Sequence, residues 1–285
     1  MTAVPELKQA APGDRAQRLV DDRYRQDDAP PLVGWSETLD TLLSHRSVRA
    51  YLPDRLDDGV IETLVAAAQS APSSSNLQVW SVVAVEDPGR KARLAALAGH
   101  QRHIDEAPLL LVWLIDFDRL TQLSQSDGVA SEALDYTETF VLGAVDTALA
   151  AQNAVVALES LGLGSVYIGG IRNHPAEVAA ELGLPPRVFP LFGLVVGKPD
   201  PGRPAAVKPR LPQASVLFRE QYAWSAAQQA AAEAYNPAIR AFQREQGMAE
   251  KDWTVQARER TRGPQSMAGR HVLRAVLGRL GFELR

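Results

Sequence analysis

Residues 157–173 read Ala-Leu-Glu-Ser-Leu-Gly-Leu-Gly-Ser-Val-Tyr-Ile-Gly-Gly-Ile-Arg-Asn, the end of a long helix followed by a glycine-rich turn. The helical pattern spans residues 131–161, is rich in Ala and Leu, and stops at Gly162 and Gly164. Its apolar residues occupy much of the circumference, which predicts burial in the core or in a subunit interface. In the turn over residues 167–172, paired glycines let backbone N–H groups approach a planar ligand closely.

The flanking sequence alternates helices with a few short strands. Strands are expected at residues 79–85, 109–115 and 191–196, where β-branched and other apolar residues run together. Helices are expected around 16–24, behind caps at Ser36 and Asp57, over 87–99, between Pro175 and Gly183, and over 225–245. The pattern is a helix-rich mixture of helices and strands.

Several common site architectures are excluded by their missing signatures. Gly162 and Gly164 follow a helix instead of a strand and lack the third glycine of a dinucleotide-binding turn. Residues 193–198 imitate a phosphate loop but are one residue short and are followed by proline. The chain has neither a His-Glu-x-x-His zinc helix nor a Gly-x-Ser-x-Gly nucleophile motif.

The amino-acid composition narrows the possible classes of protein further. The 285 residues carry a net charge of −4 with 46% hydrophobic residues, which is ordinary for a globular protein and gives no bias toward nucleic acid. The absence of cysteine excludes disulfides, thiolate metal sites, iron–sulfur clusters and thiol catalysis. Residues 1–31 lack the apolar core of a secretion signal, and the longest apolar run, 107–115, is too short to span a bilayer. We therefore expect a cytoplasmic protein with no membrane partner.

The domain organisation is expected to be simple. Residues 1–34 are interpreted as a mobile N-terminal arm, and residues 35–285 as one domain with a helical C-terminal excursion from about residue 223. Residues 236–285 hold ten Lys or Arg against five Asp or Glu. This basic excess indicates either a solvated helical face or a surface that attracts an anionic dinucleotide.

Three basic clusters carry the chemical argument. The first is His45-Arg46-Ser47-Val48-Arg49, the second is the turn 167–172, and the third is Lys208-Pro209-Arg210-Leu211-Pro212. The first cluster follows a helix, so its cations either complement the helix dipole or bind a ligand. In the third, proline fixes the backbone between two cations, which suits a phosphate. Together the clusters suit a phosphorylated aromatic cofactor such as FMN.

These motifs, in this order, resemble the nitroreductase superfamily, and within it the oxygen-insensitive NADPH nitroreductase and flavin reductase group. The resemblance runs from about Leu39 to the C-terminus and weakens after Tyr222. It is carried by residues 45–49, the Ser-rich loop at Ser73, and residues 157–173, 190–197 and 208–212. It implies an α+β fold with a mixed β-sheet flanked by helices, an intertwined homodimer, and two FMN sites at the dimer interface without a metal.

The resemblance also implies a role for individual residues. Arg49 would lie near the N1–O2 edge of the flavin, Gln101 would lie at its pyrimidine edge, and Lys208 and Arg210 would bind the phosphate. Ser73 and Asn76 would come from the partner subunit; an ordinary polar loop is the alternative for their segment. The remaining residues implied to bind FMN are His45, Arg46, Ser47, Tyr167, Ile168, Gly169 and Gly170.

The implied activity is that of an FMN-dependent oxidoreductase. NAD(P)H would deliver hydride and leave before a nitroaromatic, quinone or flavin acceptor enters, with no catalytic side chain required. Arg244 matches the segment that grips the 2′-phosphate of NADPH, but Glu245 and Glu250 stand where bases are expected, so the choice between NADPH and NADH stays open. The alternatives are a flavin-binding sensor or store without turnover, and a nucleic-acid module built on the basic C-terminal segment.

Overall fold

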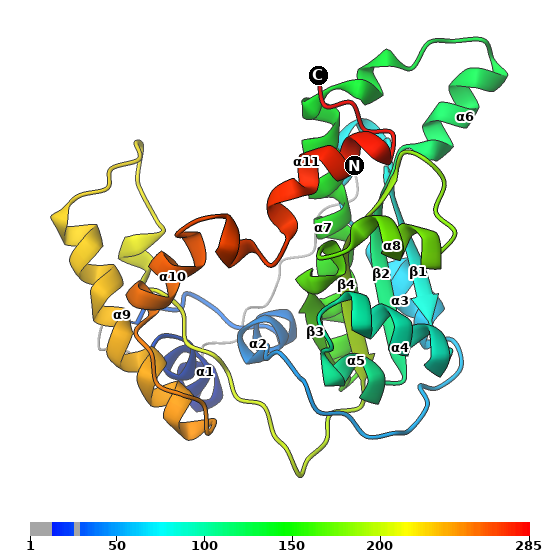
Figure 1. Cartoon of the computed structure of the whole chain (residues 1–285). Coiled ribbons are helices and arrows are strands. Elements are labelled where there is room, and N and C mark those ends of the chain that lie inside the picture. Colours follow the sequence, from blue (N-terminus) through cyan, green and yellow to red (C-terminus); the bar gives the residue numbers. More distant parts are fainter. Residues whose placement is uncertain (1–12, 26–28) are drawn as a thin grey trace, which may run out of the picture. The chain divides into compact units, whose positions relative to one another are not determined.

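Four antiparallel strands form a single sheet in the order β1-β2-β4-β3 in the computed structural model, which describes residues 13–25 and 29–285 (Figure 1). The strands are β1 (Trp80–Val85), β2 (Leu109–Asp116), β3 (Gly164–Ile168) and β4 (Val188–Gly197). Strand β3 forms one edge, and an isolated parallel bridge between Ser47 and Ser165 extends the sheet there. All three strand pairs of the sheet are antiparallel, and the only parallel pairing within the described residues that adjoins it is this isolated bridge.

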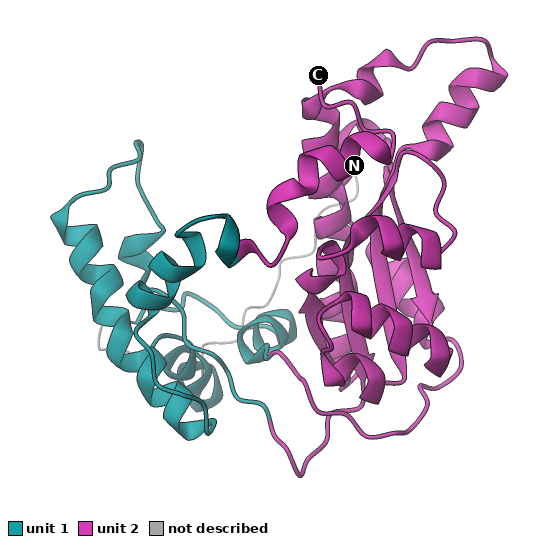
Figure 2. Cartoon of the chain, viewed as in Figure 1, with its two compact units in different colours: residues 1–46, 205–266 teal, residues 47–204, 267–285 magenta. Residues whose placement is uncertain are grey.

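The chain divides into two compact units (Figure 2). The sheet unit contains residues 47–204 and 267–285, and the helical unit contains residues 1–46 and 205–266. The predicted boundary between residues 34 and 35 stays a prediction.

The sheet is covered on both faces, as the unbroken burial of β2 requires. Helices α3 (Val60–Gln69) and α7 (Thr137–Ser160) pack on one face. Figure 1 shows α4 (Pro88–Leu97), α5 (Arg102–Glu106) and α8 (Pro175–Glu181) on the other face. The core between α3, α7 and the sheet contains Leu64, Ala68, Leu109, Leu111, Trp113, Ala150, Ala151, Ala154, Val155, Leu158, Leu194 and Val196.

Helix α7 is the long apolar helix that the sequence predicts, and one side of it is buried. By length and composition alone it could cross a membrane, but Ala150, Ala154 and Leu158 are fully buried against the sheet, as in the core helix of a globular protein. It begins at Thr137, later than the predicted residue 131, because residues 132–135 form a separate 3₁₀ turn that ends in an extended Tyr136.

The remaining elements of the sheet unit complete its periphery. They are α6 (Asp118–Ser126), α11 (Leu273–Arg279), and the 3₁₀ turns at Ser74–Asn76, Glu132–Asp135, Gly169–Arg172 and Arg270–Val272. Helix α11 closes one end of the sheet, where Leu277 joins the buried rings of Phe117, Phe189 and Phe282.

Helices make up the other unit. They are α1 (Asp14–Tyr24), α2 (Glu37–Ser44), α9 (Ala226–Glu245) and α10 (Trp253–Thr261), with 3₁₀ turns at Gln213–Ser215 and Pro264–Met267. Tyr235, Ile239 and Phe242 on α9 form a small core against Trp253. Helix α1 is the short helix expected within the arm; Ala16, Leu19 and Val20 are buried, so this part of the arm is packed. Residues 1–12 lie outside the described residues.

Most predicted elements are confirmed, with corrections at their ends. Ser36 caps α2 by accepting a hydrogen bond from the Leu39 amide at 3.2 Å. The Asp57 cap is wrong: α3 begins behind Gly59, whose φ of +83° favours glycine, and the side chain of Asp57 makes no cap. Tyr167 and Ile168, expected in a turn, end strand β3.

Candidate functional site

In the helical unit, one buried arginine brings two of the basic clusters together. Arg23 on α1 donates from Nη2 to the carbonyl oxygens of Leu43 and His45 at 2.9 Å each, and from Nη1 to the carbonyl oxygen of Lys208 at 2.8 Å. The Arg210 amide donates to the carbonyl oxygen of Arg23 at 2.8 Å. His45 therefore lies beside the Lys208-Pro209-Arg210 segment, as a shared cofactor site requires.

The Lys208–Arg210 segment is fixed from a second side by α9. The Tyr235 hydroxyl donates to the carbonyl oxygen of Pro209 at 2.8 Å, and the Lys208 Nζ lies 5.7 Å from the centre of the Phe242 ring. A cavity of about 510 Å³ opens along this segment. Its lining combines two cations with three aromatic rings: Tyr24, Lys208, Pro209, Arg210, Leu211, Val216, Tyr235, Ile239, Trp253 and Gln256.

In the sheet unit, the residues after Arg46 run along the edge of the sheet. The Val48 amide donates to the carbonyl oxygen of Ser165 on β3 at 2.8 Å. Val48 and Ala50 are buried, so Ser47 and Arg49 alternate to the exposed side of this extended segment. The pairing with β3 thus presents a hydroxyl and a guanidinium side by side at the β3 edge.

Gly170 packs directly against the segment that carries Gln101. The Gln101 Nε2 donates to the carbonyl oxygen of Ala98 at 2.8 Å. A Cβ added to Gly170 would lie 2.3 Å from that same oxygen and 2.6 Å from the Gln101 Nε2. Only glycine fits, and the close approach joins Gln101 and Gly170, two of the predicted site residues.

His103 belongs to the same region and was missed by the sequence interpretation. Burial, and secondly the charge of Arg49, hold the pKa of His103 below its ordinary value, so the imidazole is neutral at pH 7. Its buried Nε2 has no hydrogen-bond partner within the described residues. The sequence signal was available, since His103 lies two residues beyond Gln101.

Two arginines lie beside Gly169: Arg172 belongs to the second basic cluster, whereas Arg270 was not singled out in the sequence. A Cβ added there would lie 3.5 Å from the Arg270 Nη1 and 3.6 Å from the Arg172 Nη2. Burial, and then the charge of Arg270, lower the pKa of Arg172. The Arg172 Nη1 donates to the carbonyl oxygen of Leu191, and both guanidinium groups bring positive charge beside Gly169. Sequence spacing could not reveal this, because 98 positions separate the two residues.

The Ser-rich loop is anchored by a buried carboxylate on α7. The Asp146 side chain, only 2% exposed, accepts hydrogen bonds from the Ser73 Oγ at 2.6 Å and the Ser74 amide at 3.1 Å. The Ser73 Oγ in turn accepts from the Gln78 amide at 2.8 Å. An acid inside a long apolar helix is rare enough that Asp146 itself was a usable signal.

This loop holds three non-glycine residues in the left-handed region. The φ angles are 49° at Ser75, 54° at Asn76 and 52° at Gln78. Each such residue costs roughly 1–3 kcal/mol and persists only where its surroundings enforce it. The hydrogen bonds of this loop run to Asp146 on α7 and between residues of the loop itself.

The segment expected to read the 2′-phosphate is neutralised by ion pairs. Arg244 forms two hydrogen bonds of 2.8 Å to Glu250, and Glu245 pairs with Arg25 at 2.8 Å. Arg240 likewise pairs with Asp252. Four of the ten basic residues of 236–285 pair with acids of the same segment, so the basic excess itself remains.

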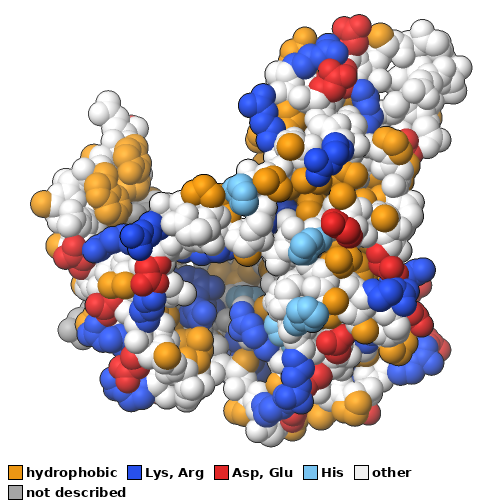
Figure 3. All heavy atoms as spheres, in the orientation of Figure 1, with side chains coloured by type: hydrophobic (Ala, Val, Ile, Leu, Met, Phe, Trp, Pro, Cys, Tyr) orange, Lys and Arg blue, Asp and Glu red, His pale blue; other side chains and the backbone are white. Residues whose placement is uncertain are grey.

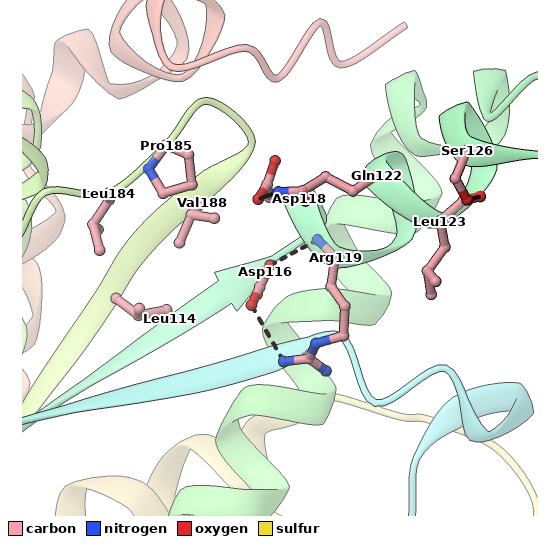
Figure 4. Close-up of a pocket in the computed structure, with 10 residues that line it drawn as sticks. All are labelled: Leu114, Asp116, Asp118, Arg119, Gln122, Leu123, Ser126, Leu184, Pro185 and Val188. Atoms are coloured by element: carbon pink, nitrogen blue, oxygen red, sulfur yellow. Dashed lines mark hydrogen bonds and ion pairs between the residues drawn. The ribbon is translucent and has the colours of Figure 1, made fainter.

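A further cavity, of about 580 Å³, contains none of the predicted site residues. It lies where β2 ends and α6 begins (Figure 4). Its central charges are paired, since Arg119 contacts Asp116 at 3.3 Å and donates to the carbonyl oxygen of Gln78 at 3.0 Å. No cluster of acids and histidines suited to a metal ion exists in the described part of the chain.

Comparison with known proteins gives consistent results. Residues 42–198 match the model of the nitroreductase family, and residues 208–285 match that of the nitroreductase family C-terminal domain. The chain is 42% identical over 188 residues to an FMN reductase (NADPH) of Bacillus subtilis, covering 66% of this chain and 75% of that protein. It is 41% identical over 187 residues to an oxygen-insensitive NADPH nitroreductase of Salmonella typhimurium, with the same shares of the two chains. The structure of NfrA2 from B. megaterium superposes with a TM-score of 0.82 at 36% identity, covering 88% of this chain and all of that one.

Proposed function

This chain belongs to the nitroreductase family, and we propose that it is an FMN-dependent oxidoreductase that uses NAD(P)H to reduce nitroaromatic, quinone or flavin acceptors. The family, the α+β fold and the oxidoreductase activity expected from the sequence are confirmed by these relatives. The observation that carries the proposal is the meeting of His45 and the Lys208–Arg210 segment around Arg23.

Each of the two units offers residues that suit a part of FMN. Lys208 and Arg210 supply two positive charges for the phosphate, and Pro209 holds them in a fixed relation. At Gly170 the backbone lies so close to Gln101 that no side chain would fit between them. The polar backbone groups of this turn can therefore approach a planar ring. When bound, FMN supplies the atom that accepts and passes on the hydride.

The protein contributes orientation and electrostatics. Arg49 places a fixed positive charge beside the neutral His103, where it would stabilise an anion on the pyrimidine edge of the ring. Arg172 and Arg270 beside Gly169 would attract the phosphates of the dinucleotide or the negative groups of an acceptor. Donor and acceptor would use one site in turn, which is the ping-pong order.

A homodimer is part of the proposal. Val141, Val145 and Leu149 form an exposed apolar stripe on α7, with exposed fractions of 50%, 51% and 40%. Apolar side chains also gather on the segment before α9, where Val216, Leu217, Tyr222 and Trp224 are exposed (Figure 3). Surfaces of this kind mark protein contacts, and a second copy would bring Ser73 and Asn76 to the site of its partner.

The central test is anaerobic reduction. We expect the purified protein to bind FMN, to show flavin absorbance, and to lose that absorbance when NADPH or NADH is added. Subsequent addition of a nitroaromatic, a quinone or free flavin should restore it. A protein that cannot be loaded with FMN would contradict the cofactor assignment, and a yellow protein that NAD(P)H leaves unbleached would favour the sensor or store.

Glu250→Gln is expected to raise the preference for NADPH over NADH about fivefold, because it releases Arg244 for the 2′-phosphate. The measurement is the ratio of kcat/KM for the two dinucleotides. Glu181→Gln, which releases Arg90 and Arg93 in the sheet unit, is the matched control and should leave the ratio unchanged. An unchanged ratio in both variants would place the 2′-phosphate away from Arg244.

A further inference from the structure

Helix α1 lies outside the part of the chain that the family models match. Those models begin at residue 42, whereas α1 spans Asp14–Tyr24. Its apolar residues are nevertheless buried, and so is Arg23, which is only 7% exposed. A buried guanidinium is retained only where its donors are satisfied, so the contacts of Arg23 reveal what the helix does.

The side chain of Arg23 joins two distant segments through hydrogen bonds to their backbone carbonyl groups. Its guanidinium binds the carbonyl oxygens of Leu43 and His45 at the end of α2, and that of Lys208, which is 185 positions away. A guanidinium is planar and its donors point in fixed directions. The three carbonyl groups are therefore held in one mutual arrangement.

The backbone of Arg23 adds a fourth link, since its carbonyl oxygen accepts the Arg210 amide at 2.8 Å. Two residues on, Arg25 pairs with Glu245 and lies 5.7 Å from the centre of the Phe242 ring, the same ring that the Lys208 Nζ approaches at 5.7 Å. The end of α1 is thus tied to both the cationic segment and α9.

We propose that Arg23 is a positioning residue that sets the spacing between His45 and the Lys208–Arg210 pair, and so makes the N-terminal helix part of the cofactor-phosphate site. Of the four residues whose backbones it binds, His45, Lys208 and Arg210 have side chains that are assigned to FMN, and Leu43 precedes His45 at the end of α2. This inference rests on the proposed function. It predicts a defect confined to recognition of the phosphate.

The test compares FMN with riboflavin, which has the same ring and no phosphate. The apoproteins of the wild type, Arg23→Ala and Arg23→Lys are titrated with each ligand, and flavin fluorescence is followed. We expect Arg23→Ala to weaken FMN binding about 10- to 100-fold, as the loss of charge-assisted bonds predicts, and to leave riboflavin binding within about twofold of the wild type. Arg18→Ala, an exposed arginine on the same helix, is the control and should bind FMN as the wild type does.

Each outcome decides the question. Equal losses for FMN and riboflavin in Arg23→Ala would show general loosening and overturn the inference, as would unchanged FMN binding. Arg23→Lys keeps the charge but not the planar fork; full recovery of FMN affinity would show that charge alone matters and would also overturn it. If Arg23→Ala does not fold, Arg23→Lys gives the same FMN-to-riboflavin comparison. A wild-type protein that binds neither ligand would refute the proposed function instead.

Discussion

Gly170→Ala is expected to lower the free energy of unfolding by about 3 kcal/mol and to abolish FMN retention. The added Cβ would lie 2.3 Å from the Ala98 carbonyl oxygen, which is backbone and cannot rotate away. The segment that carries Gln101 would have to move, and with it a predicted contact to the flavin. Denaturant unfolding of the apoprotein and flavin content after gel filtration measure the two effects.

Gly169→Ala is the matched control for this variant. Its Cβ would meet only the ends of the Arg270 and Arg172 side chains, at 3.5 and 3.6 Å, which are ordinary contacts. The free energy of unfolding should therefore stay within about 0.5 kcal/mol of that of the wild type. FMN binding should weaken if Gly169 lines the flavin ring. Equal stability of the two variants would refute the packing argument for Gly170.

Asp146→Ala is expected to cost about 2 kcal/mol of stability and to weaken FMN binding about tenfold. The change removes the acceptor of the Ser73 hydroxyl and of the Ser74 amide, each contributing roughly 1.5–3 kcal/mol as a bond to a charged group. Relief of the strain stored between Ser75 and Gln78 partly offsets that loss but moves the loop.

Amide hydrogen exchange and FMN titration test this expectation together. The amides of Ser74 and Gln78 should be protected in the wild type and exchange faster in the variant. Glu138→Ala removes an exposed acid from the same helix and should change stability by only about 0.5 kcal/mol. If the loop amides stay protected in Asp146→Ala, the carboxylate is not what holds the loop.

Local patterns predicted most of the sheet unit. The apolar runs at 79–85 and 109–115 became β1 and β2, because strands buried between two layers need apolar residues on both sides. The 191–196 run became part of β4. Strand β3 was mistaken in part for a turn, because its five residues depend on pairing with β4 and the Ser47 segment, which no local pattern encodes.

The candidate site likewise has one part that the sequence predicted and another that only the tertiary structure decided. The basic clusters, the Ser-rich loop and the family follow from the order of residues along the chain, since charge, proline and glycine act locally and can be recognised there. Which residues meet was decided by the tertiary structure. Arg23 binds His45 and Lys208, Gly170 packs on Ala98, and Asp146 holds Ser73, each across a long sequence separation that only folding closes.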